Sequence, residues 1–279
     1  MKILQTRILS LVLSTSVSAL VVTKPQRGIH MLTQSRLVQN QFGILHRKRW
    51  SIGKSPTTPL HMNIFESFFG GGGGSYFTKV DYDTLNHPGP ELGQAAIEGK
   101  VLTYSIVDTN LEVATFAGGC FWGLELAYQR VSGVRYTTAG YTQGTENDPN
   151  YDQVCSGNTG HTESVCVYFD PNECSYEDLL DVFFTRVDPL TKDGQGNDYG
   201  RQYRTGVYYH TSKQEQIARD RFQEEQKKYK KQIIHTERKK AMPFWPAEKN
   251  HQQFLQNGGR TNSPQSTDKG CTDTIRCYG

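Results

Sequence analysis

No two cysteines in this 279-residue chain are separated by only two residues. The six cysteines are Cys120, Cys155, Cys166, Cys174, Cys271 and Cys277. Structural zinc sites typically use closely spaced cysteine pairs, so we expect no metal site. Six cysteines are also sparse for a domain of this size, which needs no disulfide staples. A secreted, disulfide-stapled binding module stays open as an alternative, because the cysteine count is even.

Acidic residues are missing from the first 65 positions, where nine basic residues lie. The first acidic residue is Glu66, so residues 66–279 carry 22 basic and 28 acidic side chains, a net charge of about −6. The whole chain, in contrast, has a formal charge of +3. A basic surface for nucleic acid is therefore not expected, since the positive charge belongs to a segment that processing would remove.

The chain also lacks an apolar run that clearly suits a transmembrane helix. Residues 8–22 are apolar but diluted by Ser and Thr, follow a short basic region, and include the small-residue stretch Val17–Ala19. This layout is typical of a secretory signal peptide. Residues 20–61 are basic, free of acids and rich in hydroxyl residues, which is transit-peptide composition.

We therefore expect residues 1–61 to form a bipartite targeting presequence, with a signal peptide to about Ala19. It resembles the presequences of algae with secondary plastids, so we predict import into a plastid and no membrane anchor in the mature form. The alternatives are a secretory protein and a long mitochondrial presequence. Residues 62–110 are predicted to be a linker and an N-terminal arm, because Gly70–Gly74 is flexible and residues 75–110 are loop-rich.

From residue 111 onward, apolar residues recur with strand and helix periods in turn. Strands are predicted at residues 111–117, 134–142, 162–169, 205–210 and 233–236. Helices are predicted around residues 124–130, at 176–186 after the cap Ser175, and from 211 or 212 to about 230. Residues 243–279 have no regular pattern. The class predicted for residues 111–279 is α+β, a sheet with helices packed against it.

The segment Gly118–Gly123 places a cysteine in a glycine-rich turn between a strand and a helix. Free backbone N–H groups and the helix dipole favour an anion at such a helix N-terminus. The position therefore lowers the pKa of a thiol and makes Cys120 a candidate nucleophile. Two alternatives remain from the residues alone: a buried, inert cysteine, and a cysteine hydrolase that uses His161 as its base.

Gly118-Gly119-Cys120-Phe121-Trp122-Gly123 resembles the signature of the A-type peptide methionine sulfoxide reductases. Four further segments resemble that family in the same order, at residues 140–142, 151–163, 195–204 and 269–279. The tail looks like the plant and algal branch. The resemblance implies a two-layer α/β sandwich with a mixed sheet, a ferredoxin-like core, and a long coiled C-terminal segment.

The resemblance also implies a role for each matching residue. Cys120 would attack the sulfoxide sulfur and become a sulfenic acid. Glu163 would protonate the sulfoxide oxygen, which requires a raised pKa. Tyr151 and Tyr203 would bind that oxygen through their phenols, and Asp198 would position a water or its neighbouring groups.

Phe121 and Trp122 match the apolar pocket that accepts the methyl group of the substrate. Taken alone, residues of these types are ordinary core or surface residues. His161 is expected to be structural, Cys155 to be buried, and Cys166 and Cys174 to have no role in the chemistry.

Cys271 and Cys277 lie in a Gly- and Thr-flanked tail, residues 261–279, that we expect to be flexible enough to reach Cys120. The resemblance implies that one tail cysteine forms a disulfide with Cys120 and the other displaces it, after which thioredoxin reduces the pair. The sequence leaves the order open. No bound cofactor is expected, and the electron donor is thioredoxin.

The expected enzyme is a monomer that reduces methionine-S-sulfoxide, in oxidised proteins and as the free amino acid, and repairs proteins under oxidative stress.

Overall fold

The computed structural model describes residues 79–277. The predicted presequence and the Gly70–Gly74 linker lie outside these residues. The helices are α1 (Gly89–Ile97), α2 (Phe121–Gln129), α3 (Tyr151–Cys155), α4 (Tyr176–Arg186) and α5 (Ser212–Lys228). The strands are β1 (Glu112–Ala117), β2 (Val134–Thr142), β3 (Thr162–Phe169), β4 (Gly194–Gln195), β5 (Asp198–Tyr199), β6 (Gly206–Tyr209), β7 (Glu237–Lys240) and β8 (Trp245–Pro246). Within residues 79–277, every helix is too short or too polar to cross a membrane.

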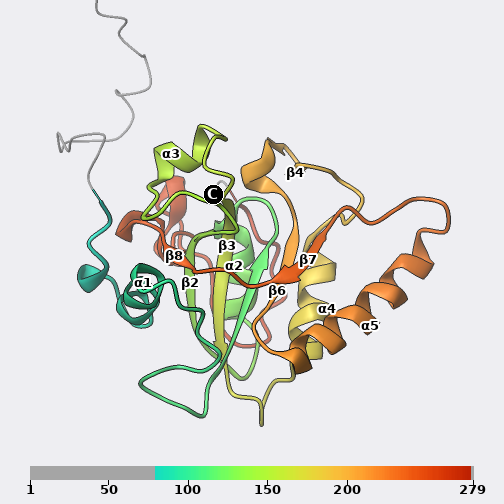
Figure 1. Cartoon of the computed structure of the whole chain (residues 1–279), viewed down its shortest axis with the longest axis horizontal. Coiled ribbons are helices and arrows are strands. Elements are labelled where there is room, and N and C mark those ends of the chain that lie inside the picture. The colour runs from blue at the N-terminus through green and yellow to red at the C-terminus, as the bar shows by residue number, and fades with distance from the viewer. Residues whose placement is uncertain (1–78, 278–279) are drawn as a thin grey trace, which may run out of the picture. The chain divides into compact units, whose positions relative to one another are not determined.

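Six strands form one sheet in the order β7-β6-β1-β3-β2-β8, and β4 and β5 form a separate two-stranded hairpin (Figure 1). Strands β6 and β7 run parallel, whereas the other neighbouring pairs are antiparallel. The predicted α+β class with a mixed sheet is therefore confirmed.

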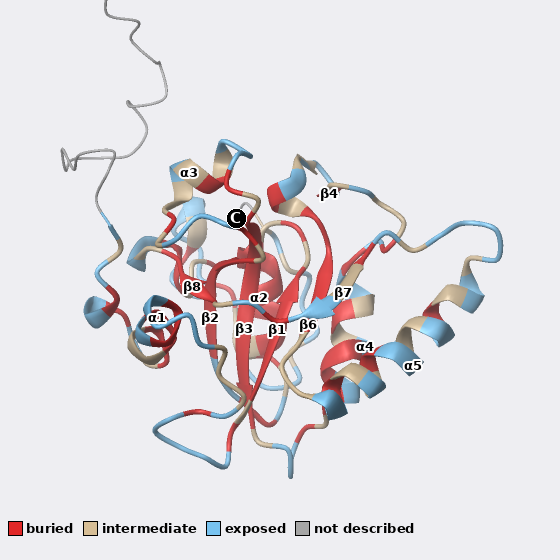
Figure 2. Ribbon diagram, in the orientation of Figure 1, coloured by how far each residue is buried: buried red, intermediate tan, exposed pale blue. Residues whose placement is uncertain are grey.

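Strand β3 is buried on both faces, because its side chains alternate between two clusters. Val165, Val167 and Phe169 pack in the main core with the apolar faces of α2 and α4. Cys166 and Tyr168 belong to a smaller cluster that includes Leu92 of α1 and Phe244. Figure 2 shows this buried centre, with the exposed face of α5 at the periphery. The central strands thus form a rigid base for the residues at their ends.

Local signals in the sequence correctly predicted several elements. Strands β2 and β3 have the predicted bounds, and so does α4. Ser175 forms a capping box with Asp178 at the start of α4, and Thr211 caps α5. These side chains accept hydrogen bonds from backbone N–H groups that the first helical turn leaves free.

Two expectations need correction. The strand predicted at residues 233–236 is wrong: Ile233 is 72% exposed, and β7 begins later, at the charged residue Glu237. Charged side chains are typical of an edge strand, so apolar periodicity does not reveal one. Helix α1 was not predicted in the arm. It buries Leu92, Ala95 and Ala96, and this tertiary packing stabilises a nine-residue helix that contains two glycines and a proline.

Candidate active site

The turn between β1 and α2 carries Cys120 as the N-cap residue of α2, as the sequence predicted. Gly119 adopts a left-handed conformation with φ +80°. A Cβ atom at this position would lie 2.6 Å from Cβ of Gln195, so the turn and the β4–β5 hairpin approach each other closely. The glycines therefore bring the hairpin, with Asp198, to the thiol.

The pKa of the Cys120 thiol is raised well above its ordinary value. Burial is the main cause, and the charge of Glu163 adds to it. A hydrogen bond from the backbone N–H of Trp122 lowers the pKa but does not offset these effects. The expected lowering of the pKa by the helix N-terminus is therefore wrong for this structure, because desolvation of the thiolate outweighs it.

Glu163 is the second residue of β3 and is only 2% exposed. Its Oε2 atom accepts a hydrogen bond from the backbone N–H of Phe121 at 3.0 Å, at the first helical residue after Cys120. Burial is the main cause that raises the pKa of this carboxyl to about 8; the nearby charge of Asp198 adds to the shift, and the hydrogen bond from Phe121 opposes it. At neutral pH the side chain is therefore mostly protonated and can donate a proton.

Two phenols lie near this carboxyl. Tyr151 begins α3, and Tyr203 ends the short 3-10 helix Arg201–Tyr203. Burial raises the pKa of both phenols, and the charge of Glu163 contributes to both shifts. Both side chains thus remain neutral hydrogen-bond donors at neutral pH.

A cavity of about 380 Å³ opens beside the thiol and is lined by Cys120, Asp198, Arg186 and Cys277, among others. The Sγ atom of Cys277 lies directly over Gly123, one turn along α2 from Cys120. Cys271 does not line this cavity. The structure therefore brings one of the two predicted resolving cysteines to the nucleophile and leaves the other outside.

Phe121 and Trp122 lie in an aromatic cluster, 1% and 7% exposed. The Trp122 ring stacks on Phe254 with their centroids 3.9 Å apart, and the guanidinium of Arg260 lies 5.5 Å from the Trp122 ring. Phe121 packs against Tyr141, with ring centroids 5.9 Å apart. The two residues thus form an apolar wall next to Cys120.

The C-terminal coil supplies residues that no sequence motif indicated. Glu248 accepts hydrogen bonds from the backbone N–H of Tyr151 at 2.8 Å and from the Tyr141 hydroxyl at 3.0 Å. The ring of His251 stacks on Tyr151 at 4.5 Å. The only signal for this contribution is the density of aromatic residues between Phe244 and Phe254, which has no strand or helix period.

His161 is structural, as expected. Its Nδ1 atom accepts the backbone N–H of Gly144 at 3.2 Å, and its Nε2–H donates to the carbonyl of Glu146 at 2.7 Å. Both ring nitrogens are therefore occupied, and neither is available as a base for Cys120. This geometry disfavours the hydrolase alternative.

All six cysteines are free thiols, so the structure offers no support for a disulfide-stapled module. Cys155 is half-buried, whereas Cys166 and Cys174 are buried. In the described part of the chain, no cluster of three or more His, Cys, Asp or Glu side chains is arranged to hold a metal ion.

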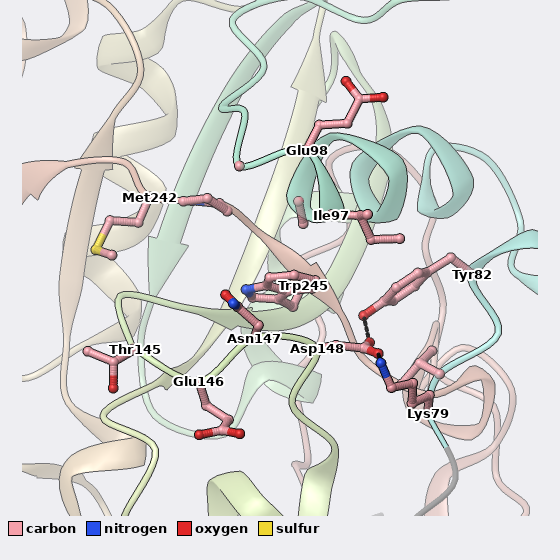
Figure 3. Close-up of a pocket in the computed structure, with 15 residues that line it drawn as sticks. Lys79, Tyr82, Ile97, Glu98, Thr145, Glu146, Asn147, Asp148, Met242 and Trp245 are labelled. Atoms are coloured by element: carbon pink, nitrogen blue, oxygen red, sulfur yellow. Dashed lines mark hydrogen bonds and ion pairs between the residues drawn. The ribbon is translucent and has the colours of Figure 1, made fainter.

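A larger cavity, of about 910 Å³, lies between α1 and the loop of residues 144–148 (Figure 3). Asp148 closes one end of it by accepting a hydrogen bond from the Tyr82 hydroxyl at 2.7 Å and pairing with Lys79 at 3.1 Å. Trp245 and Met242 also line it, but none of the predicted site residues does. The smaller cavity is lined by Cys120, Asp198 and Cys277, whereas Glu163, Tyr151, Tyr203, Phe121 and Trp122 do not line it. The candidate active site is therefore centred on Cys120.

Comparisons with known proteins agree with this assignment. The model of the family "Peptide methionine sulfoxide reductase" matches residues 112–274. Peptide methionine sulfoxide reductase A3 of Arabidopsis thaliana is 54% identical over 168 residues, which are 60% of this chain and 83% of that protein. The chloroplastic reductase A4 of the same plant is 54% identical over 174 residues, which are 62% of this chain and 67% of that protein.

Solved structures of this class share the fold. Methionine sulfoxide reductase A of Corynebacterium diphtheriae is 29% identical, with a TM-score of 0.50 over 56% of this chain and 81% of that one. Mxr1 of Saccharomyces cerevisiae in its reduced form is 31% identical, with a TM-score of 0.50 over 57% of this chain and 90% of that one. This chain belongs to the peptide methionine sulfoxide reductase family.

Proposed function

We propose that this chain reduces methionine-S-sulfoxide, in oxidised proteins and as the free amino acid, through a sulfenic acid on Cys120. Family membership makes the chain an oxidoreductase that acts on methionine sulfoxide. The observation that carries the mechanism is the position of Glu163, a buried carboxyl with a pKa of about 8 that is hydrogen-bonded beside the nucleophile.

In the first step, the Cys120 thiolate attacks the sulfoxide sulfur while Glu163 gives its proton to the sulfoxide oxygen. The sulfur–oxygen bond of the sulfoxide breaks, the protonated oxygen passes to the Cys120 sulfur to give a sulfenic acid, and methionine leaves with its sulfur reduced by two electrons. The phenols of Tyr151 and Tyr203 donate hydrogen bonds to the oxygen as its negative charge develops. Asp198 orients groups in the cavity.

Phe121 and Trp122 accept the methyl group of the substrate at the apolar wall. An apolar wall favours a methyl substituent, because a polar group placed against it would lose its hydrogen bonds to water.

In the second step, Cys277 attacks the sulfenic sulfur of Cys120, which forms a disulfide and releases water. Its presence in the cavity of Cys120 supports this order, since Cys271 lies outside that cavity. Cys271 then attacks Cys277, which returns Cys120 as a thiol and leaves a Cys271–Cys277 disulfide. The dithiol of a thioredoxin reduces that disulfide, so the enzyme needs no bound cofactor.

The proposed setting is protein repair under oxidative stress in a plastid. Two observations support the location: the composition of residues 1–61 and the name of the relative called chloroplastic. We propose that the mature chain is monomeric and acts without nucleic acid or membrane, in keeping with its net negative charge.

The test is a single turnover of the reduced full-length chain with racemic methionine sulfoxide and no added reductant. In the first turnover we expect about one methionine formed and two thiols lost per enzyme, with only the S epimer consumed. The Cys120 thiol that the relay returns can then react once more, which gives a second methionine and consumes a third thiol. Cys120→Ser should form no methionine. If the wild type also forms none, although alkylating agents still modify Cys120, the proposed reaction is wrong.

Tail variants test the order of the relay in the same assay. Cys277→Ser should form one methionine and retain a sulfenic acid on Cys120. Cys271→Ser should form one methionine and stop at a Cys120–Cys277 disulfide, which peptide mass mapping detects. A Cys120–Cys271 disulfide in the wild-type reaction would contradict the proposed order, and full thioredoxin-driven cycling of either variant would contradict the relay itself.

A further inference from the structure

Arg130 follows the last residue of α2 and is almost fully buried, at 7% exposure. Its Nε atom donates to the carbonyl of Ser266 at 2.9 Å, and its Nη1 atom donates to the carbonyl of Asp273 at 2.6 Å. Its own carbonyl accepts the backbone N–H of Gly270 at 2.8 Å. One residue thus binds the C-terminal tail at three points.

Other hydrogen bonds support this attachment. The ammonium of Lys269 donates to the carbonyls of Gln129 and Val134, at 2.7 and 2.8 Å. The side chain of Gln265 exchanges two hydrogen bonds with the backbone of Arg276, at 2.8 and 3.0 Å. Residues 265–276 are thus held against the domain by side-chain and backbone hydrogen bonds.

Helix α2 connects this attachment to the chemistry. Cys120 is the N-cap of the helix and Arg130 is its C-cap, so about 14 Å of rigid helix separates them. The tail is bound at the C-cap end and returns along the helix until Cys277 lies over Gly123. Two hydrogen bonds from one buried guanidinium, and a third to the carbonyl of the same residue, therefore hold the tail on the path that leads to Cys277.

We propose that Arg130 is a positioning residue that docks the tail on α2, so that Cys277 lies in the cavity before Cys120 is oxidised. The inference rests on the proposed relay. In the step concerned, a sulfur–sulfur bond forms between Cys277 and Cys120, the sulfur–oxygen bond of the sulfenic acid breaks, and the oxygen leaves as water. Docking raises the effective concentration of the Cys277 thiol and shortens the lifetime of a sulfenic acid that further oxidant would destroy.

The test compares Arg130→Met with wild type in the full-length chain. Met keeps an unbranched apolar stem but donates no hydrogen bond. Arg219→Met, which removes an exposed arginine paired with Glu215 on α5, is the matched control. After rapid mixing with methionine sulfoxide, methionine formation is followed separately from loss of the second thiol, and dimedone traps the sulfenic acid.

We expect Arg130→Met to form methionine at the wild-type rate but to form the disulfide about tenfold more slowly or worse, with dimedone labelling of Cys120. The rate of disulfide formation in Arg130→Lys should lie between those of wild type and Arg130→Met, because one ammonium cannot reproduce the planar fork of the guanidinium. Arg219→Met should match wild type. Disulfide formation at the wild-type rate in Arg130→Met would overturn the proposal.

Failure of the wild type to form methionine would refute the proposed function rather than the docking. If Arg130→Met alone forms no methionine, the substitution has damaged the fold, and Gln265→Leu decides instead. This variant removes the two hydrogen bonds to the backbone of Arg276. It should also form methionine at the wild-type rate and the disulfide more slowly. Unaltered disulfide formation in Gln265→Leu would then overturn the proposal.

Discussion

At the scale of single residues, the charge of the Glu163 carboxyl influences the ionisation of the Cys120 thiol. Each is buried, and a negative charge on Glu163 raises the pKa of the thiol. A proton on Glu163 removes that repulsion, and the same proton is the one that the sulfoxide oxygen needs. The site therefore favours the combination of a thiolate and a neutral acid over two charged groups.

The first prediction concerns pH. Because the pKa of Glu163 is about 8, the acid is protonated below that pH and loses its proton as the pH rises through it. The thiolate fraction of Cys120 also grows with pH over this range, because the pKa of that thiol lies well above its ordinary value. The single-turnover rate of methionine formation in wild type should therefore rise to about pH 8 and level off above it, where loss of the acid offsets the gain of thiolate. Glu163→Gln should be about 10²–10⁴-fold slower, as expected for loss of a general acid, and its rate should keep rising above pH 8.

Glu224→Gln, which changes an exposed carboxylate on α5, is the control and should retain the wild-type pH profile. Measurement of methionine by rapid quench from pH 6 to 10 decides between the outcomes. A wild-type rate in Glu163→Gln, or the same levelling above pH 8, would show that another group is the acid.

At the scale of elements, helix α2 positions both cysteines of the proposed first disulfide. Its N-cap carries the nucleophile, and the missing side chain of Gly123 leaves room for Cys277. A glycine inside a helix costs about 1 kcal/mol relative to alanine. The close approach of the tail offers a physical reason for a glycine at this position.

The second prediction is that Gly123→Ala stabilises helix α2 but slows formation of the disulfide between Cys120 and Cys277. The alanine should favour the helix by up to about 1 kcal/mol, but its methyl group would collide with the Sγ atom of Cys277 and displace the tail. We expect disulfide formation to slow about tenfold while methionine formation continues, as measured by thiol titration after mixing. Disulfide formation as fast as in wild type would mean that the tail does not need this space.

At the scale of the whole molecule, the side chain of Glu125 connects helix α2, strand β2 and the C-terminal coil through hydrogen bonds. This α2 side chain is 1% exposed and accepts hydrogen bonds from the Thr137 hydroxyl of β2 at 3.2 Å and from the backbone N–H of Gln253 at 2.9 Å. Burial raises the pKa of its carboxyl to about 8 despite these bonds. The C-terminal coil is thus attached to the core through an acid that is uncharged at neutral pH.

The third prediction concerns stability. The pKa of Glu125 is about 8 in the folded chain and near its ordinary value of 4.5 when unfolded. The folded state therefore binds more protons between these values, and stability falls as pH rises, by at most about 1.4 kcal/mol per pH unit from this group. Glu125→Gln has no group to ionise at this position and should not show this fall. The difference in free energy of unfolding, Glu125→Gln minus wild type, should therefore increase from pH 5 to pH 8.

Urea unfolding at several pH values measures this difference, and Glu224→Gln again provides a control at an exposed site. A constant difference between Glu125→Gln and wild type across this range would mean that Glu125 ionises normally in the folded chain.

The sequence by itself determined the elements whose causes are local. The periodicities of residues 134–142 and 162–169, the capping of residues 176–186 by Ser175, and the place of Cys120 before a helix all follow from neighbouring residues. The resemblance of whole motifs added the candidate site residues, because spacing alone does not distinguish Glu163 from a surface carboxylate.

Only the tertiary structure decided the features that depend on burial and on segments distant in the chain. Helix α1 forms because it packs on the sheet, and the pKa of Glu163 rises because β3 and α2 together exclude water from it. Cys277 rather than Cys271 lies in the cavity of Cys120 because Arg130 binds the tail more than 130 residues away along the chain. Desolvation and contact between remote segments leave no periodic trace in a sequence, since their energies depend on what surrounds each group after folding.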